Sequence, residues 1–347
     1  MKRIFLLLMA AFAFASCQDP IDFYGDETNN LVVVNALAKE DSVFATSLYF
    51  SRFFLSNKPF EEIPNASLTL NVNGTDYTGS HQGNGNYGFN YIPHQGDSLT
   101  LTAIVPGHEP VSASTRVPKR PVVKDFESRS ELHYDGYGDY YYSDYYTYEI
   151  RFKLEDPDSE RNYYRLKVRY NDTCYARTYH NYNYQTDTYS DTVFDTLTNS
   201  NTRHYYTIED MYIVDNEVLG SVINAIDGEA QGTYYGPELI FSDDKINGQT
   251  HEIKLTMDQY NTYNSYSSDP LWQHVEFEVI IEALSEEYFY YLLTTQKQLD
   301  NDEMAGIISE PTTIISNVKG GIGVLGATSC VVKPIRFQFD YENTDNR

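Results

Sequence analysis

A thiol near the start of the chain stands in a pattern that predicts covalent modification. Cys17 directly follows two small residues that end an apolar run, and a Lys-Arg pair precedes that run. This order of basic, apolar and small residues is typical of a secretory signal. A cysteine at the cleavage point predicts a lipoprotein signal, so that residues 1–16 are removed and the Cys17 thiol is acylated.

Two other interpretations of this segment stay open. A transmembrane helix needs about 20 apolar residues, whereas the run from Ile4 to Ala15 is shorter and polar sequence follows it. An ordinary cleaved signal with an incidental cysteine is the second, and Phe14 stands where lipoprotein signals usually carry leucine. We favour lipidation, with residues 17–30 as a polar, acidic linker.

The sequence carries no common catalytic signature. It has no G-x-S-x-G elbow, no phosphate loop or dinucleotide fingerprint, and no Cys/His grouping with zinc spacing. His251-Glu252 lacks a second histidine four residues later and lies in a predicted strand. We therefore expect no enzyme activity, no catalytic residue and no cofactor. A hydrolase with two facing carboxylates is the least favoured alternative.

Carboxylates at alternate positions could supply oxygen ligands to Ca²⁺. Asp156, Asp158 and Glu160 follow this spacing. The stretch lacks the glycine turn and distal glutamate of a full calcium loop, so we favour a polar turn. Acids at the end of a predicted helix are unfavourable for the helix dipole and could mark a cation site; they are Asp300, Asp302 and Glu303. We favour a solvated helix end there and predict no metal site.

Tyrosine is unusually abundant, with 33 tyrosines against one tryptophan. A Tyr- and Asp-rich stretch spans residues 134–148, and tyrosine gives a large contact area at low entropic cost, as in antibody paratopes. We predict a loop that contacts a partner or ligand, and the alternative is a loop with an aromatic bias and no binding role. The candidate contact residues are Tyr137, Tyr140, Tyr141 and Tyr145.

The charge balance limits the partners. The chain has 50 Asp and Glu against 25 Lys and Arg. Such a surface repels phosphate backbones and anionic membrane faces. We expect no nucleic-acid partner, and attachment to a membrane only through the N-terminal lipid.

Two cysteines remain beyond Cys17. Cys174 and Cys330 could form a disulfide in an oxidising compartment. Each also lies in a predicted strand and fits a buried thiol. We favour two unpaired, buried cysteines.

These candidate residues must be positioned by an all-β chain. Between residues 31 and 118, short alternating segments are separated by turns, and the segment 67–72 leads into the hairpin signal Asn73-Gly74. Regularly spaced strands over this length predict an immunoglobulin-like β-sandwich. Prolines at 118 and 121 mark the predicted domain boundary.

A larger β-rich domain is predicted over residues 119–341. Residues 150–154 and 275–281 alternate apolar and polar side chains, which predicts half-buried strands. Ser285 can cap a helix whose first turn is acidic, and the apolar spacing that follows predicts a helix near 286–300. We expect a second sandwich that carries this one helix.

Three motif regions resemble one family, the lipoproteins of domain of unknown function family 4249 from the Bacteroidota. The order and spacing are similar over residues 31–339. The motif residues are Asp156-Pro157 to Asn162-Tyr163-Tyr164-Arg165; Phe241-Ser242-Asp243 to Asn247-Gly248-Gln249; and Ser285-Glu286-Glu287-Tyr288 with Ser309-Glu310-Pro311, Ser316-Asn317, Gly320-Gly321-Ile322-Gly323 and Gly326. The family has no established catalytic residues to transfer.

The resemblance implies an envelope lipoprotein of the kind found beside TonB-dependent transporters of the outer membrane. The expected function is a non-enzymatic accessory or ligand-binding subunit, with the ligand unknown. We expect it at the outer membrane, lipid-anchored on the cell surface, with the periplasmic face as the alternative. A free-standing surface binding or adhesion lipoprotein is the alternative function.

Overall fold

The computed structural model describes residues 30–53, 57–135, 143–158, 160–183, 185–186, 188–198, 206–207, 212–213, 238–260, 268–303 and 313–340. Cys17, Tyr137, Tyr140 and Tyr141, and the predicted signal, lie outside the described residues. Within these ranges the chain is strand-rich and contains the helix α3 (Glu286–Glu303). The predicted all-β sandwich fold with one helix is confirmed.

The strands form three sheets. In spatial order, the ten-stranded sheet contains β12 (Thr188–Thr198), β11 (Tyr163–Asn183), β17 (Ser268–Leu284), β18 (Ile322–Asp340), β1 (Val32–Lys39), β2 (Ala45–Phe50), β6 (Asn86–Gly88) and β5 (Ser80–Gly83), while β13 (Tyr206–Thr207) and β15 (Glu238–Ser242) also pair with β11. The second sheet contains β14 (Tyr212–Ile213), β16 (Thr250–Tyr260), β10 (Ser143–Glu155) and β9 (Val122–Asp135). The third contains β4 (Thr75–Thr78), β3 (Ser67–Val72), β7 (Ser98–Ile104) and β8 (Val111–Arg116).

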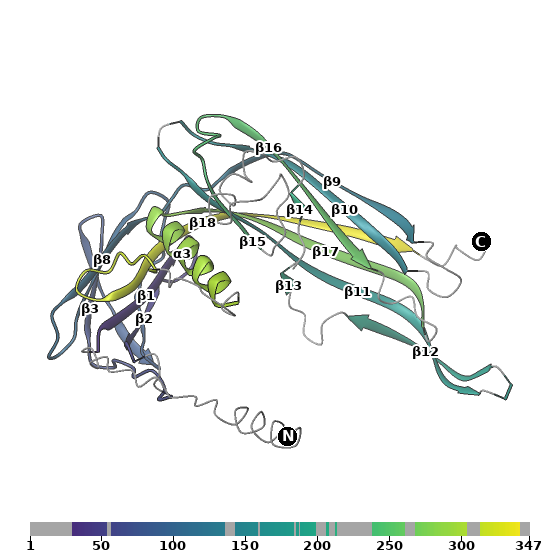
Figure 1. Cartoon of the computed structure of the whole chain (residues 1–347), viewed down its shortest axis with the longest axis horizontal. Helices are drawn as coiled ribbons and strands as arrows, with labels where there is room; N and C mark the ends of the chain where they lie inside the picture. Colours follow the sequence, from purple (N-terminus) through teal and green to yellow (C-terminus); the bar gives the residue numbers. More distant parts are fainter. Residues whose placement is uncertain are drawn as a thin grey trace, which may run out of the picture.

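Two hydrophobic cores lie between these sheets. In the smaller sandwich, alternating residues of β1 and β3 are buried, because every second side chain of a strand points to the same face. In the larger sandwich, β10, β16 and β17 contribute their alternate residues in the same way. Figure 1 shows the N-terminal strands, purple to blue, gathered at one end, and the long strands at the other.

One strand belongs to both sandwiches. The first part of β18 pairs in parallel with β1, from Ile322 opposite Val33 to Thr328 opposite Lys39. The rest pairs antiparallel with β17, as far as Asp340 opposite Trp272. The core of the smaller sandwich therefore includes Val318, Leu325 and Ala327 from the far end of the chain. Figure 1 shows β18, in yellow, extending from one sandwich into the other.

The predicted boundary near residue 118 coincides with the passage of the chain from β8 to β9. That passage does not separate the two sandwiches completely, because the smaller one is completed by residues after 317. The division into domains at this point stays a prediction.

Close backbone contact explains the glycines before and within β18. Gly323 has a φ of 113°, and a Cβ placed on it would lie 2.0 Å from the Val34 carbonyl oxygen. A Cβ on Gly326 would lie 2.7 Å from the Tyr288 ring of α3. The Asn317 side chain donates to the Ser114 and Leu325 carbonyls and accepts from the Leu325 N–H. These contacts hold β18 against β1, β8 and α3.

The predicted tyrosine loop is shorter than expected. β9 continues to Asp135 and β10 begins at Ser143, so the ends of the predicted loop are strands. Tyr146 and Tyr148 are core residues, and Tyr148 packs edge-on against Phe277 with ring centroids 4.8 Å apart. Tyr145 lies in β10, where its backbone is opposite His133 and Tyr260. Alternating tyrosines here indicate a buried strand face rather than a loop.

The cysteine prediction is half correct. Both Cys174 and Cys330 are free thiols, as expected. Cys174 is buried, whereas Cys330 is exposed, so the prediction that both are buried is wrong. Along β17 their partners are Gln273 and Glu282, which at about 3.3 Å per residue places the thiols far beyond the reach of a disulfide.

A carboxyl group lies inside the larger sandwich. Asp172 is 2% exposed, and both of its oxygens accept hydrogen bonds from the Gln273 side-chain amide at 3.0 Å. Burial raises the pKa of Asp172 to about 6, although the Gln273 hydrogen bond acts in the opposite direction. The nearby Tyr148 hydroxyl is buried without a hydrogen-bond partner among the described residues. This part of the core is therefore destabilised when Asp172 ionises.

Replacing Gly323 with alanine should destabilise the protein far more than the same change at Gly107. Both glycines have positive φ, but only at Gly323 would the new Cβ meet backbone atoms; at Gly107 nothing lies within 4 Å. We expect a loss of about 3 kcal/mol or more in the free energy of unfolding for G323A, against about 1–2 kcal/mol for G107A. Denaturant unfolding measures both. Equal losses would contradict the close approach of β1 and β18.

Replacing Asp172 with asparagine should stabilise the protein at neutral pH. Because the folded pKa is raised from 3.8 to about 6, the unfolded chain ionises first, and the wild type loses stability as pH rises through this range. The unfolding free energy of D172N relative to wild type should therefore increase by up to about 3 kcal/mol between pH 3.5 and pH 7.5.

The control is Asp125→Asn on β9. Lys153 lies 2.7 Å from the Asp125 carboxylate and lowers its pKa, so this variant should gain no stability at pH 7.5. If the difference in unfolding free energy between D172N and wild type does not change with pH, Asp172 does not ionise in a buried position, and the prediction is wrong.

Candidate binding cleft between the two sandwiches

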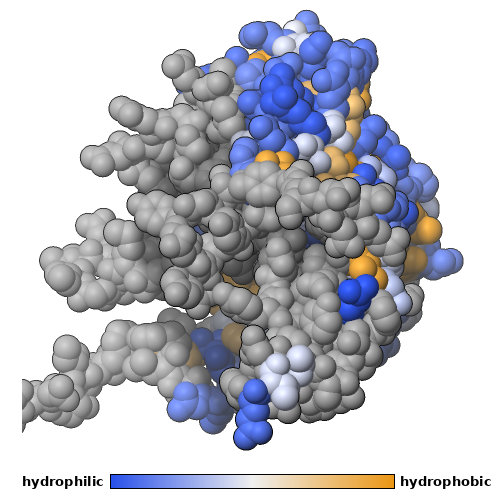
Figure 2. All heavy atoms as spheres, turned by 90° about the vertical axis from the view of Figure 1, so that its right-hand side faces the viewer, coloured by the Kyte–Doolittle hydropathy of each residue, from blue (hydrophilic) through white to orange (hydrophobic). Residues whose placement is uncertain are grey.

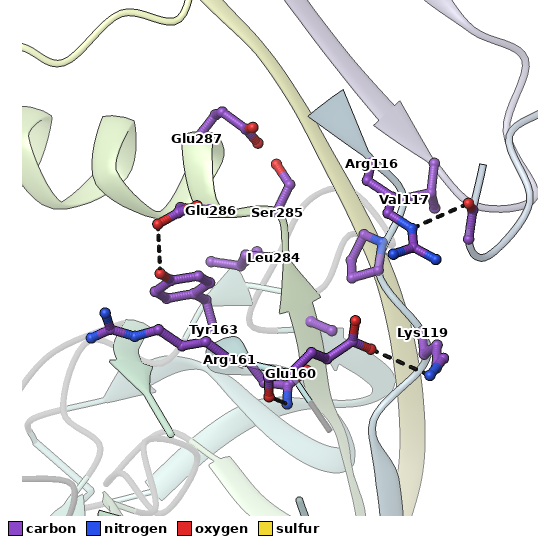
Figure 3. Close-up of a pocket in the computed structure, with 14 residues that line it drawn as sticks. Arg116, Val117, Lys119, Glu160, Arg161, Tyr163, Leu284, Ser285, Glu286 and Glu287 are labelled. Atoms are coloured by element: carbon purple, nitrogen blue, oxygen red, sulfur yellow. Dashed lines mark hydrogen bonds and ion pairs between the residues drawn. The ribbon is translucent and has the colours of Figure 1, made fainter. Parts of the chain in front are cut away.

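A cleft of about 380 Å³ lies where the two sandwiches meet. Its walls come from three places in the chain: the end of β8 and the segment after it (residues 116–119), the start of β11 with the turn before it (160–163), and the end of β17 with the first turn of α3 (283–287). Gly96 completes the lining. Figure 3 shows these segments surrounding a common space.

One wall of the cleft is acidic. Glu286 and Glu287 occupy the first turn of α3, where the helix dipole favours negative charge. Glu286 accepts a hydrogen bond from the Tyr163 hydroxyl at 3.0 Å, and Glu287 accepts one from the Thr115 hydroxyl at 3.0 Å. These hydroxyls come from β11 and β8, so the two carboxylates are held by different sandwiches.

The opposite wall is basic. The Nε of Arg116 donates to the Gly96 carbonyl at 3.3 Å, and Lys119 lies 3.3 Å from the Glu160 carboxylate. Figure 3 shows Arg116 and Lys119 on one side of the space, with Glu286 and Tyr163 on the other. Between them, Val117, Pro118, Ala283 and Leu284 give the cleft an apolar lining.

The helix begins at the cleft because Ser285 joins it to β18. The Ser285 carbonyl accepts the first helical hydrogen bond, from the Phe289 N–H at 2.9 Å. The Ser285 hydroxyl, predicted from sequence to cap the helix, accepts a hydrogen bond from the Ala327 N–H instead. Phe289 then packs on Tyr163, with ring centroids 4.5 Å apart. This packing fixes Glu286 and Glu287 at the cleft edge.

Buried carboxylates hold the turn before β11 and the turn between β15 and β16. Asp156 is 7% exposed and accepts from the Tyr164 hydroxyl at 2.6 Å and the Gly248 N–H at 3.1 Å. Asp243 is 1% exposed and accepts from the Asn162 N–H at 2.7 Å. Burial raises the pKa of Asp156. These hydrogen bonds set the direction in which residues 160–163 enter the cleft.

The three motif regions singled out in the sequence meet at this junction. Asp156 and Asn162 belong to the first region, Asp243 and Gly248 to the second, and the start of α3 to the third. In the sequence they appeared as turns with structural roles. Arg116, Lys119 and the acidic wall were not recognised from the sequence as binding candidates, because helix-end acids and linker cations have ordinary explanations. The recurrence of motif residues in three distant segments was the one available signal.

Of the site residues predicted from sequence, the structure describes Tyr145, which does not join the cleft. Tyr145 lies in β10 of the larger sandwich, away from the lining segments. Within the described ranges, no group of three His, Cys, Asp or Glu could hold a metal ion. Among the same residues, no helix is long and apolar enough to cross a membrane.

Replacing Asp156 with alanine should destabilise the protein, because the buried Tyr164 hydroxyl and the Gly248 N–H both lose their acceptor. We expect a loss of about 2–4 kcal/mol in the free energy of unfolding. Asp158→Ala, in the same turn but exposed, is the control and should stay within about 0.5 kcal/mol of wild type. Calcium should stabilise none of these proteins in a thermal melt. Equal effects of the two substitutions would refute the assigned role of Asp156.

Comparison with known proteins places this fold and its cleft in a family. No curated protein sequence matches the chain. The family described as domain of unknown function (DUF4249) matches residues 18–333, which include the smaller sandwich, α3, all segments that line the cleft, and the larger sandwich except the last part of β18. Since the match covers well over half of the chain, the protein belongs to the DUF4249 family.

Proposed function

We propose that this protein is an outer-membrane lipoprotein, anchored through Cys17, that binds a ligand in the cleft and serves as a non-enzymatic accessory subunit of a TonB-dependent transporter. The observation that carries the binding role is the cleft itself. It lies between two sandwiches, has charged walls of both signs and an apolar lining, and its volume is within the range of small-ligand sites.

A binding role suits the cleft carboxylates better than an acid–base role. An acid-pair hydrolase places two carboxylates on opposite sides of the bond that it breaks. Glu286 and Glu287 are neighbours on one helix turn, and each already accepts a hydrogen bond from a fixed hydroxyl. Glu160, on the opposite wall, is paired with Lys119 at 3.3 Å. Glu286 and Glu287 can act as fixed acceptors for a ligand cation.

The envelope location is supported by the N-terminal sequence, with its basic start, apolar run and cysteine after small residues. The transporter as partner is supported by analogy with the lipoproteins that the motifs resemble, which is an associational argument. Figure 2 adds that the described surface at the far end of the larger sandwich is mainly hydrophilic, with hydrophobic residues in small separate patches.

Purification of the tagged protein from native outer membranes in mild detergent should recover a β-barrel transporter in stoichiometric amount. Cys17→Ala should abolish this recovery, because the protein would lose its lipid anchor. The intact mass of the wild type, measured in parallel, should show an acylated N-terminal cysteine.

Recovery of the acylated protein alone, under conditions that preserve other such complexes, would contradict the accessory role and favour a free-standing surface binder. An N-terminus without acyl chains would contradict the anchor.

A further inference from the structure

We infer that the cleft binds a short peptide as a zwitterion, with the peptide's ammonium group at Glu286 and Glu287 and its carboxylate at Arg116. This inference rests on the proposed function of the cleft as a binding site and names its ligand class. The ligand is recognised at both ends by opposite charges, while its middle lies on the apolar lining.

The acidic wall has negative charge that the protein does not neutralise. Among the described residues, no Lys, Arg or His nitrogen forms an ion pair with Glu286 or Glu287. Their hydrogen bonds come from the neutral hydroxyls of Tyr163 and Thr115. A carboxylate has about four acceptor positions, so both groups can still accept from an ammonium that carries three donors.

The basic wall has an arginine without an acidic partner. In the described part of the chain, no carboxylate forms an ion pair with Arg116, and its Nε–H is occupied by the Gly96 carbonyl. The two terminal nitrogens of the guanidinium keep their donors, in the planar arrangement that matches a carboxylate. Lys119 differs, because Glu160 already pairs with it. Arg161, the third cation of the lining, is paired with Asp244 at 2.7 Å. Arg116 is therefore the lining cation that has no carboxylate partner among the described residues.

The space between the walls fits a ligand with an apolar or peptide-like middle. Val117, Pro118, Ala283 and Leu284 line it, and its volume of about 380 Å³ lies at the small end of ligand sites. A phosphate or dicarboxylate would meet two uncompensated glutamates. A diamine would leave Arg116 unpaired. A di- or tripeptide satisfies both walls without adding net charge to an acidic protein.

The binding test uses tri-alanine with the mature protein in isothermal titration calorimetry, beside its N-acetylated and C-amidated forms and putrescine. Free tri-alanine should bind, and each capped form should bind on the order of tenfold more weakly, because each cap removes one charge-assisted contact. Putrescine should bind more weakly than tri-alanine. Equal binding of free and capped peptides, tighter binding of putrescine, or no binding of tri-alanine would each overturn the inference.

Substitutions in the two walls test which wall binds the carboxylate of the peptide and which binds its ammonium group. Arg116→Gln should lose the preference for the free carboxylate but keep the preference for the free ammonium, and a Glu286→Gln/Glu287→Gln double variant should show the reverse. Arg336→Gln, on the part of β18 distant from the cleft, is the control and should bind like wild type. Variants that lose neither preference would overturn the assignment even if the peptide binds. The membrane purification tests the accessory role without any peptide, and the titration tests peptide binding without the transporter. Failure of peptide binding is therefore distinguishable from failure of the accessory role.

Discussion

The parallel pairing of β1 with the first part of β18 is the interaction on which the rest of the structure depends. It closes the sheet of the smaller sandwich with residues almost three hundred positions away in sequence. The same strand then continues into the larger sandwich, beside β17. Since a strand is stiff over a few residues, and β18 passes without a break from its pairing with β1 to its pairing with β17 at Thr328, the two cores cannot rotate freely about the junction. The cleft between them is therefore held open by the fold rather than formed by a loop.

Buried charge beneath α3 reinforces this geometry. Arg165 on β11 pairs with Glu282 on β17, and its guanidinium lies 5.6 Å from the centroid of the Tyr288 ring of α3. Burial alone would lower the pKa of such an arginine, but Glu282 raises it, so the guanidinium stays charged. A buried pair of this kind contributes little net stability, but it is costly to break. It therefore specifies how the helix lies on the sheet, and thus where Glu286 and Glu287 stand.

The sequence predicted local structure well, because alternation and capping act between neighbouring residues. The strand at residues 275–281 and the helix that begins after Ser285 follow directly from such patterns. The partner of β1 could not be predicted, because parallel pairing leaves no turn signal between the strands. Tyr146 and Tyr148 were misassigned to a loop, because tyrosine is compatible with both surface and core. The cleft was missed because each of its charges has an ordinary local explanation, and only the fold brings the walls together.

The strand β18, which belongs to both sandwiches, also determines the order in which the two sandwiches can complete their folding. A chain synthesised from its N-terminus contains β1, β2 and the third sheet long before β18 exists, so one side of β1 stays unpaired until the end of the chain is made. An unpaired apolar strand can form hydrogen bonds with strands of other chains, which leads to aggregation. The first sandwich to emerge is therefore among the last to be completed, and loss of the final thirty residues would unfold the beginning of the protein as well as its end.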